Sequence, residues 1–387
     1  MSFFDNETKR FPLASIADYR LIAKKRLPQY LFDFIDGGSF NEVTRKSNSE
    51  DYQRIELRKR VLKDVSNIDT SIEILGQKLS QPIILAPVGY AGIYARRGEV
   101  QAARAAEKAG VPFSLSSVSI CSMDEVQQSA SVPFWYQFYM LKEKSLSLDL
   151  LNRAKAAGCP VLLLTVDLPS VGIRHRYHRS RSLCNYNVFS HLSWYMDVRL
   201  RGQPLILGDI VKIAPHLSDL SSMRKWMGAH LSPSMTWKDL EWIRANWSGK
   251  IVLKGIMDAE DAYLAAERGM DGLVVSNHGA RHLDCTPSTI SVLPDIVSAV
   301  GDRLDVLIDG GIGSGLDVVK ALALGAKACL IGRAWAFALA ARGEEGVSEV
   351  LSIFQNELTS VMSQLGVKSI KEIDGKILCS SKHIKKP

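Results

Sequence analysis

Eight short apolar runs that alternate with helix-forming stretches are the feature that most restricts the fold of this 387-residue chain. They occupy residues 82–89, 111–117, 133–141, 160–167, 250–256, 271–277, 304–311 and 328–333. Helical patterns such as GEVQAARAAEKAG and GLDVVKALALG lie between most of them, and the Gly that follows each pattern fits a C-cap. Eight strand-then-helix units predict an α/β fold, the TIM (β/α)8 barrel. A doubly wound sheet would have fewer strands and a Gly-rich first turn, which is missing.

The remaining segments are expected to surround this barrel within a single domain, residues 1–387. Residues 1–80 are predicted to form an N-terminal helical extension, in which residues 15–35 give two short helices separated by Pro28. The barrel itself is expected over residues 81–365. It is interrupted after the fourth strand by a long excursion, residues 170–235, rich in Arg, His, Trp, Tyr and Leu. A connection of this length is usually functional or disordered.

Composition narrows the class of protein. No run of eighteen apolar residues is present, so no membrane-spanning helix is expected. The start, MSFFDNETKRF, lacks the apolar core of a secretory signal. Six scattered cysteines without CxxC spacing argue against a zinc site or a disulfide framework and favour reduced thiols in a cytoplasmic protein. The net charge of +7 would suit nucleic acid, anionic lipid or an anionic substrate, but no nucleic-acid-binding motif accompanies it. We therefore expect neither a metal nor a nucleic-acid partner.

The segment VVSNHGARHLD places His278 and Arg281 three residues apart at the end of the sixth strand. In a TIM barrel, the loops at the carboxyl ends of the strands carry the chemistry. A His can act as a base near neutral pH, and an Arg can hold a carboxylate by a bidentate fork. The pair therefore suits an anionic substrate that loses a proton. Local sequence alone favours the simpler alternative, a buried hydrogen-bonded His beside a surface Arg.

Residues at three further strand ends favour the catalytic interpretation of His278 and Arg281. Asp167 can orient and charge-balance the imidazole, although Pro169 also fits a turn or N-cap Asp. Tyr139 can donate to a substrate oxygen, or can be a core aromatic with a satisfied hydroxyl. Lys254 would need an anionic partner if buried, and a cation there would stabilise negative charge on an electron-accepting ring. The glycines of DGGIGSG, residues 309–315, and of Gly332-Arg333 predict a phosphate site at strands seven and eight.

The chain resembles the FMN-dependent α-hydroxy-acid dehydrogenases and oxidases, and most of all their bacterial respiratory L-lactate dehydrogenases. The resemblance covers nearly the whole chain and rests on SNHGARHLD, LTVDLP, RLPQYLFDFIDGG, RRGEVQAARAAEKAG, TWKDLEWIR and DGGIGSGLDVVKALALGAKACLIGR. It implies oxidation of an L-2-hydroxy acid, above all L-lactate, to the 2-oxo acid, with electrons passed to a membrane quinone or another carrier. Four alternatives remain: an oxidase that makes hydrogen peroxide, a mandelate-type dehydrogenase, a degenerate flavin-binding barrel without turnover, and a different FMN barrel such as an isoprenoid isomerase. The His-Gly-x-Arg motif, with Tyr139 and Asp167, disfavours the last.

The resemblance also implies roles for individual residues. His278 would be the base and Asp167 would stabilise its imidazolium, while Arg281, Arg174 and Tyr139 would bind the substrate. The flavin and its ribityl phosphate would meet Pro87, Val88, Gly89, Ser116, Gln137, Thr165, Lys254, Ser276, Asp309, Gly310, Gly311, Gly313, Gly332 and Arg333. Tyr90, Val118 and the excursion would shape the pocket for the substrate side chain.

Two positions depart from the family pattern. Phe34 stands where the family usually has a Tyr whose hydroxyl helps to hold the substrate carboxylate. Loss of one such hydrogen bond to a charged group costs about 1.5–3 kcal/mol, and a larger or more apolar substrate would compensate. Gly313 stands where relatives carry a phosphate-binding Arg, so we expect weaker retention of FMN.

The excursion matches the region that anchors membrane-bound members of the family. Its segments LSWYMDVRL and SSMRKWMGAHL mix aromatic with basic residues, as an interfacial segment does. We therefore expect peripheral contact with the inner face of the cell membrane through residues 175–230, the alternative being a soluble substrate lid. The resemblance further implies a homo-oligomer, often a tetramer.

Overall fold

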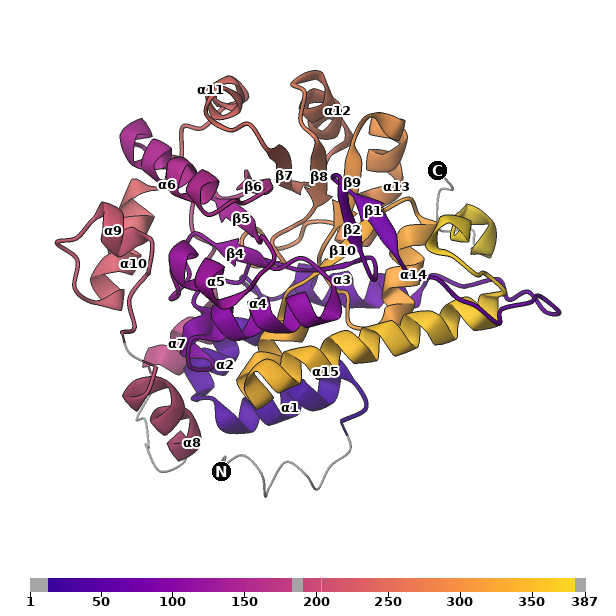
Figure 1. Cartoon of the computed structure of the whole chain (residues 1–387), viewed down its shortest axis with the longest axis horizontal. Coiled ribbons are helices and arrows are strands. Elements are labelled where there is room, and N and C mark those ends of the chain that lie inside the picture. Colours follow the sequence, from indigo (N-terminus) through magenta and orange to yellow (C-terminus); the bar gives the residue numbers. More distant parts are fainter. Residues whose placement is uncertain (1–12, 183–190, 203, 380–387) are drawn as a thin grey trace.

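The computed structural model describes residues 13–182, 191–202 and 204–379 (Figure 1). Expectations that concern residues 1–12, 183–190, 203 and 380–387, including part of the excursion, lie outside the described residues. Each of the eight predicted runs contains a strand. The strands are β3 (Ile83–Leu85), β4 (Ser114–Ser116), β5 (Trp135–Phe138), β6 (Val161–Thr165), β7 (Lys250–Ile256), β8 (Gly272–Val275), β9 (Asp305–Ile308) and β10 (Ala328–Ile331).

These strands are parallel and follow the order β3-β10-β9-β8-β7-β6-β5-β4. The two strands at the ends of this order meet through a bridge between Leu85 and Phe113, and the Leu85 N–H donates to the Pro112 carbonyl at 2.9 Å. The sheet therefore closes into the predicted TIM barrel.

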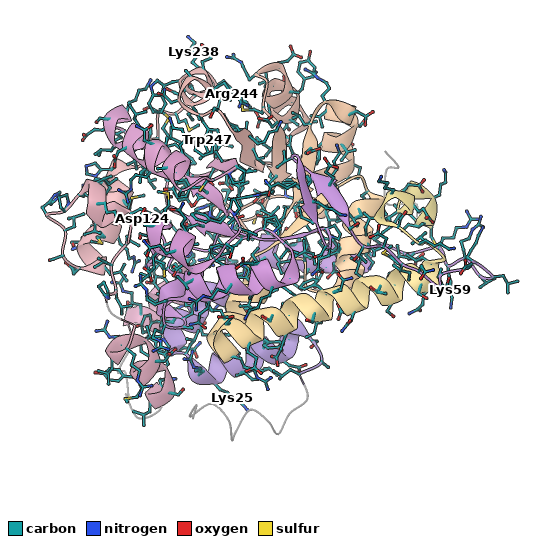
Figure 2. All side chains as sticks on the ribbon, viewed as in Figure 1. Lys25, Lys59, Asp124, Lys238, Arg244 and Trp247 are labelled. Atoms are coloured by element: carbon teal, nitrogen blue, oxygen red, sulfur yellow. The ribbon has the colours of Figure 1, made fainter. Side chains whose placement is uncertain are left out.

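The strands read as continuous apolar runs because both of their faces are buried. Ile84, Leu163, Val252 and Leu307 belong to one core cluster inside the barrel, while the alternate residues pack against the helices. Side chains fill the interior, so the barrel has a packed core and is not a channel (Figure 2). Labelled residues such as Lys25, Lys59 and Lys238 project from the periphery in the same view.

A layer of helices surrounds the strands (Figure 1). It comprises α4 (Gly98–Ala109), α5 (Met123–Ser129), α6 (Lys144–Ala156), α11 (Asp239–Asn246), α12 (Ala259–Glu267), α13 (Thr289–Val300), α14 (Gly315–Ala323) and α15 (Arg333–Leu365), which is kinked at Arg342 and Gly343. The predicted terminal glycines Gly110, Gly158, Gly269 and Gly325 all adopt positive φ one or two residues after a helix. Short 3-10 turns lie at η2 (Ala91–Ile93), η5 (Gly301–Arg303), η6 (Ile370–Glu372) and η7 (Gly375–Ile377).

The N-terminal extension contains α1 (Ile16–Arg26), α2 (Gln29–Asp36) and α3 (Val43–Gln53). The predicted break at Pro28 is present, since Pro28 is the N-cap of α2. The extension is not wholly helical, because β1 (Ile72–Ile74) and β2 (Gln77–Leu79) form an antiparallel hairpin. The hairpin covers the amino-terminal end of the barrel, where Trp135 Nε1 donates to Gln77 Oε1 at 3.1 Å. The opposite end therefore stays open for a site.

The excursion lies beside the barrel as a group of short helices, at the left of Figure 1. They are α7 (His175–Ser182), α8 (Leu192–Trp194) with a π-helical continuation (Tyr195–Leu200), α9 (Ile210–Ile213) and α10 (Leu220–His230). Within the described residues, no helix is both long and apolar enough to cross a membrane.

Candidate active site

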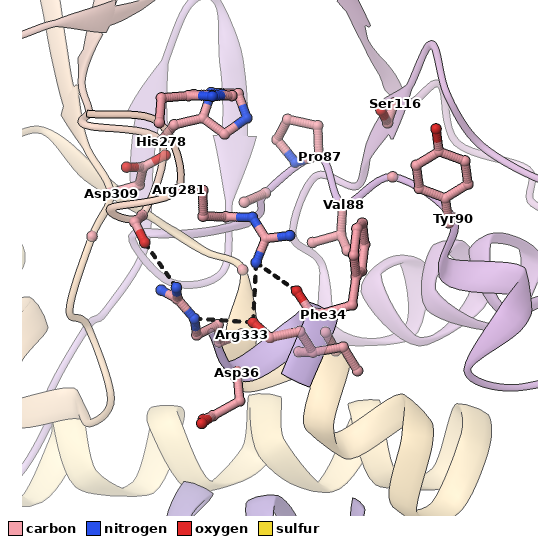
Figure 3. Close-up of a pocket in the computed structure, with 18 of the residues that line it drawn as sticks. Phe34, Asp36, Pro87, Val88, Tyr90, Ser116, His278, Arg281, Asp309 and Arg333 are labelled. Carbon is pink, nitrogen blue, oxygen red and sulfur yellow. Dashed lines mark hydrogen bonds between the residues drawn. The ribbon is translucent and has the colours of Figure 1, made fainter. Parts of the chain in front are cut away.

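A cavity of about 800 Å³ opens at the carboxyl ends of the strands. All the residues singled out from the sequence line it except Asp167 and Ser276, and each of these two bonds to a lining residue. Figure 3 shows His278, Arg281 and Asp309 on one side of this pocket, across from Val88 and Ser116. His278 and Arg281 thus converge on one space, as a shared substrate requires.

His278 and Asp167 form a pair across two loops. His278 Nδ1 lies 3.0 Å from Asp167 Oδ1, and His278 adopts φ +55°, a left-handed conformation that non-glycine residues seldom hold outside functional sites. Burial, together with the nearby Lys254 and Arg281 cations, lowers the pKa of His278 well below its usual 6.5. The imidazole is therefore neutral at pH 7. Because Nδ1 donates to the carboxylate, the lone pair lies on Nε2, where a base needs it.

Two guanidinium groups lie over the ring of Phe34. Arg174 Cζ lies 5.0 Å and Arg281 Cζ 5.1 Å from the ring centroid. Arg281 Nη1 donates to the Phe34 carbonyl at 2.8 Å, whereas Arg174 Nη1 is buried without a hydrogen-bond partner among the described residues. Burial and the neighbouring Arg281 lower the pKa of Arg174 to about 9. Two buried cations of this kind call for an anion between them.

Tyr139 completes the polar side of this space. Burial, followed by the nearby Asp167 carboxylate, raises the pKa of Tyr139 above its usual 10. The phenol therefore stays protonated and can donate a hydrogen bond to a substrate oxygen.

Polar side chains from neighbouring strands form a row along the wall of the pocket. Ser116 Oγ donates to Gln137 Oε1 at 3.0 Å, and Gln137 Nε2 donates to Thr165 Oγ1 at 3.0 Å. Thr165 in turn is the register partner of Lys254. Since each residue lies at or near the end of its strand, the parallel pairing of β4, β5, β6 and β7 brings the four together.

Lys254 is buried with the anionic partner that the sequence argument required. Its Nζ lies 2.8 Å from Asp309 Oδ2 and donates to Ser276 Oγ at 2.8 Å. Burial alone would lower the pKa of Lys254, but the Asp309 and Asp167 carboxylates outweigh burial and raise it. Lys254 is thus a fixed cation at the edge of the pocket.

Two glycines of the predicted phosphate site, Gly310 and Gly311, are required by close packing. Gly310 and Gly311 have φ of +92° and +85°, and a Cβ on Gly311 would lie 1.8 Å from the Asn48 carbonyl oxygen. Arg333 Nε and Nη2 already donate to the carbonyls of Ile35, Gly37 and Gly279. That leaves Nη1 of Arg333 to approach a phosphate without loss of these bonds. Gly313 has open space beside its Cα, since a Cβ there would meet no atom nearer than Asp317 Oδ2 at 3.9 Å.

These residues fit FMN. A backbone cradle without side chains suits a ribityl phosphate, a fixed lysine suits the pyrimidine edge of a flavin, and Asp309 Oδ1 is buried without a partner among the described residues. The sequence pattern of the FMN-dependent dehydrogenases matches residues 23–380. The chain belongs to this family. It is therefore an FMN-dependent oxidoreductase.

Two relatives of known sequence and one solved structure resemble the chain over nearly its whole length. It is 47% identical over 376 residues to the L-lactate dehydrogenase of Caulobacter sp. (strain K31), covering 95% of this chain and 99% of that protein. The L-lactate dehydrogenase of Alcaligenes faecalis is 46% identical over 373 residues, with 95% and 98% covered. Among solved structures, the monotopic membrane protein (S)-mandelate dehydrogenase matches with a TM-score of 0.91 and 34% identity, over 96% of this chain and 100% of that one.

Several residues in or near this cavity were not found from the sequence. Asn48 and Asn277 exchange two amide hydrogen bonds, of 2.9 and 2.8 Å, which join α3 to the loop after β8. Arg224 of α10 lines the pocket, and His282 lies with its ring centroid 4.0 Å from that of His278. Of these residues, only His282 could have been found from the sequence, because it is a second histidine in the segment that contains His278.

Proposed function

We propose that this FMN-dependent dehydrogenase oxidises an L-2-hydroxy acid, with L-lactate as its main substrate, to the 2-oxo acid. One observation carries the proposal: a neutral histidine paired with a carboxylate at 3.0 Å faces the same cavity as two arginines that lie over the ring of Phe34. Such a site binds a carboxylate and removes a proton next to it. The L-lactate dehydrogenases at 46–47% identity support lactate in particular.

The chain's own residues divide the work as follows. Arg281 and Arg174 bind the substrate carboxylate, and Tyr139 donates its hydroxyl hydrogen to a substrate oxygen. His278 Nε2 accepts one proton of the hydroxy acid, from the hydroxyl or from the α-carbon, and Asp167 stabilises the imidazolium that results. FMN, when bound, supplies the acceptor of the two electrons. Lys254 offers its positive charge at the edge of the pocket.

A second candidate substrate is a 2-hydroxy acid with an aromatic side chain. A chamber of about 530 Å³ adjoins the site behind Phe34 and Tyr90 and is lined by Leu31, Ile93 and Leu220 among others. The likeness to (S)-mandelate dehydrogenase and to mandelate oxidase, the latter 35% identical with a TM-score of 0.83, favours this class.

Anaerobic stopped-flow measurements on the holoenzyme test both candidates. Glycolate, L-lactate, longer 2-hydroxy acids and mandelate are mixed with the protein, and the bleaching of flavin absorbance is followed. Fastest bleaching by L-lactate supports the proposal, and fastest bleaching by mandelate supports the second candidate. If no hydroxy acid bleaches the flavin, the chain is a flavin-binding barrel without this activity.

We also propose that the electrons leave to a membrane quinone and that the protein lies peripherally on the cytoplasmic face of the membrane, as a homo-oligomer. The likeness to a monotopic membrane enzyme supports membrane contact. Of the expected aromatic anchors, Trp194 does not contribute, because it is buried and donates Nε1 to the Ile93 carbonyl at 2.8 Å, whereas Tyr195 and Trp226 are half-buried. The apolar side chains of Leu192, Met196 and Leu200 in the segment of Trp194 are exposed and can enter the membrane interface.

Two measurements check the acceptor and the location. With lactate as substrate, reduction of a quinone analogue should outpace oxygen consumption, and the reverse would identify an oxidase. Flotation with anionic liposomes at low salt should carry the protein, and replacement of Leu192, Met196 and Leu200 by Ser should abolish flotation. If the wild-type protein does not float with the liposomes, the membrane contact is excluded.

A further inference from the structure

Two loops carry the parts of the proposed site that handle the substrate. The loop after β6, residues 166–174, bears Asp167 and Arg174, and the loop after β8, residues 276–284, bears His278 and Arg281. The relative position of these loops decides whether base and carboxylate-binding arginines act on one molecule. The His278–Asp167 pair joins them at one end.

His282 joins the same two loops at a second point. The Gly172 N–H donates to His282 Nδ1 at 3.3 Å. A Cβ on Gly172 would lie 2.3 Å from the Arg281 carbonyl oxygen and 2.5 Å from His282 Cα, so the first loop rests directly on the backbone of the second. Only a glycine permits this approach.

The state of the His282 ring follows from this contact. Because Nδ1 accepts a hydrogen bond, it must carry the lone pair, and the ring is the Nε2–H tautomer. Burial above all, with a smaller effect of the neighbouring His278 ring, lowers the pKa of His282 to about 2. The acceptor is therefore available throughout the range in which the enzyme can work.

Arg174 depends on this contact because its own side chain is weakly held. Its Nη1 lacks a hydrogen-bond partner among the described residues, and the guanidinium rests on the face of Phe34. The backbone two residues earlier, at Gly172, is fixed by His282. Two other backbone hydrogen bonds lie nearby: the Phe40 N–H donates to the Ile173 carbonyl at 2.9 Å, and the His178 N–H donates to the Arg174 carbonyl at 3.0 Å. They tie the loop to the N-terminal extension and to α7, and neither reaches the loop that carries the base.

We propose that His282 is a positioning residue that clasps the loop of Arg174 to the loop of His278 and so sets Arg174 for the substrate carboxylate. This inference rests on the proposed function, because it assigns the carboxylate to Arg174. It predicts that loss of the acceptor weakens binding of the substrate and leaves the proton transfer by His278 largely intact.

Two variants of the holoenzyme separate the acceptor from the bulk of the side chain. His282→Leu removes the acceptor, whereas His282→Gln keeps one in its amide oxygen. In the Leu variant we expect the KM for L-lactate to rise about three- to tenfold, the range for one hydrogen bond, with the limiting rate of flavin bleaching within about twofold of wild type. The Gln variant should restore the KM.

A binding measurement without turnover completes the test. The Kd of oxalate, read from the perturbation of flavin absorbance, should rise in the Leu variant and recover in the Gln variant. An unchanged Kd in the Leu variant, or a loss confined to the rate of bleaching, overturns the inference. If lactate bleaches the flavin of the wild-type enzyme but both variants bind oxalate as tightly as the wild type, the positioning role of His282 is wrong and the proposed function stands.

If the Leu variant does not fold, the wild-type holoenzyme labelled with 15N-histidine still decides the question. The nitrogen shifts of His282 should report a neutral ring with the proton on Nε2 down to pH 5. A proton on Nδ1 overturns the inference, because Nδ1 could then not accept from Gly172.

Discussion

The guanidinium of Arg281 lies over the ring of Phe34, with Cζ 5.1 Å from the ring centroid. Arg174 occupies a similar position at 5.0 Å. A tyrosine at this position would offer the same ring together with a hydroxyl. In this chain the ring attracts both cations by its negative face, and it contributes no hydrogen bond to the substrate.

Phe34→Tyr should therefore improve the enzyme. The added hydroxyl can donate to the substrate carboxylate, and we expect kcat/KM for L-lactate to rise about tenfold or more. Steady-state kinetics with a quinone analogue measure this. Phe34→Leu is the matched control, since it removes the ring and should lower kcat/KM. An unchanged value in the Tyr variant would show that the hydroxyl has no partner in this pocket.

The pH dependence of kcat/KM should reveal the environment of His278. The base acts only when it is neutral, so activity is lost as the pH falls through its pKa. Because burial and the nearby Lys254 and Arg281 lower that pKa, the acid limb should lie below pH 6.5, the usual value for His. Lys254→Met removes one of the cations and should move the limb to higher pH. A limb at or above 7 in the wild type contradicts the described environment.

Gly313→Arg should tighten the binding of FMN. A Cβ at position 313 would meet no atom closer than 3.9 Å, so a larger side chain fits there. Arg333 already donates hydrogen bonds from Nε and Nη2 to backbone carbonyls. A new charged hydrogen bond to the phosphate should lower the FMN dissociation constant about tenfold or more. Flavin fluorescence after dialysis measures it, with Gly313→Ala as the neutral control. Wild-type affinity equal to that of the Arg variant would mean that Arg333 and the strand-end amides suffice.

Asp36→Asn should destabilise the fold. Asp36 is fully buried and accepts from Arg20 at 2.7 Å, Arg45 at 3.1 Å and Arg176 at 2.7 Å, which ties α1, α3 and α7 together. Loss of its charge weakens the hydrogen bonds to three partly exposed guanidinium groups, of which Arg45 and Arg176 keep Glu42 as a partner. We therefore expect a cost of about 1.5–3 kcal/mol in the free energy of unfolding. Urea unfolding at pH 7 measures the difference.

The same carboxylate predicts how the effect changes with pH. Burial would raise the pKa of Asp36, but the three arginines outweigh burial and hold it below its usual 3.8. A depressed folded-state pKa gives stability that is present above pH 3.8 and is lost as the pH falls through the folded-state value. The gap between wild type and variant should therefore shrink below pH 3.8. Asp64→Asn, at an exposed pair with Lys368, is the control and should leave the urea midpoint unchanged.

The fold could be predicted because its signal is local. Residues such as Ile84 and Leu85 are apolar in succession since one faces the barrel interior and the next faces the helices, and a helix that ends at Gly110 needs a residue tolerant of positive φ. The placement of Lys254, His278 and Asp309 at one end follows from parallel strands, whose carboxyl ends meet on the same side. The roles of these residues came from a motif that the family shares.

Other features depended on contacts between distant segments. Trp194 reads as a membrane anchor in the sequence but packs against Ile93, a residue about a hundred positions away. Likewise, no local sequence pattern predicts that Asp36 accepts hydrogen bonds from three arginines or that Gly172 packs against His282. The order of apolar and polar residues along the chain determined which elements form, because backbone geometry acts over a few residues. Which side chains face each other was decided only by how the extension, the excursion and the strand-end loops pack on the barrel, because burial and charge pairing act between whatever segments the fold brings together.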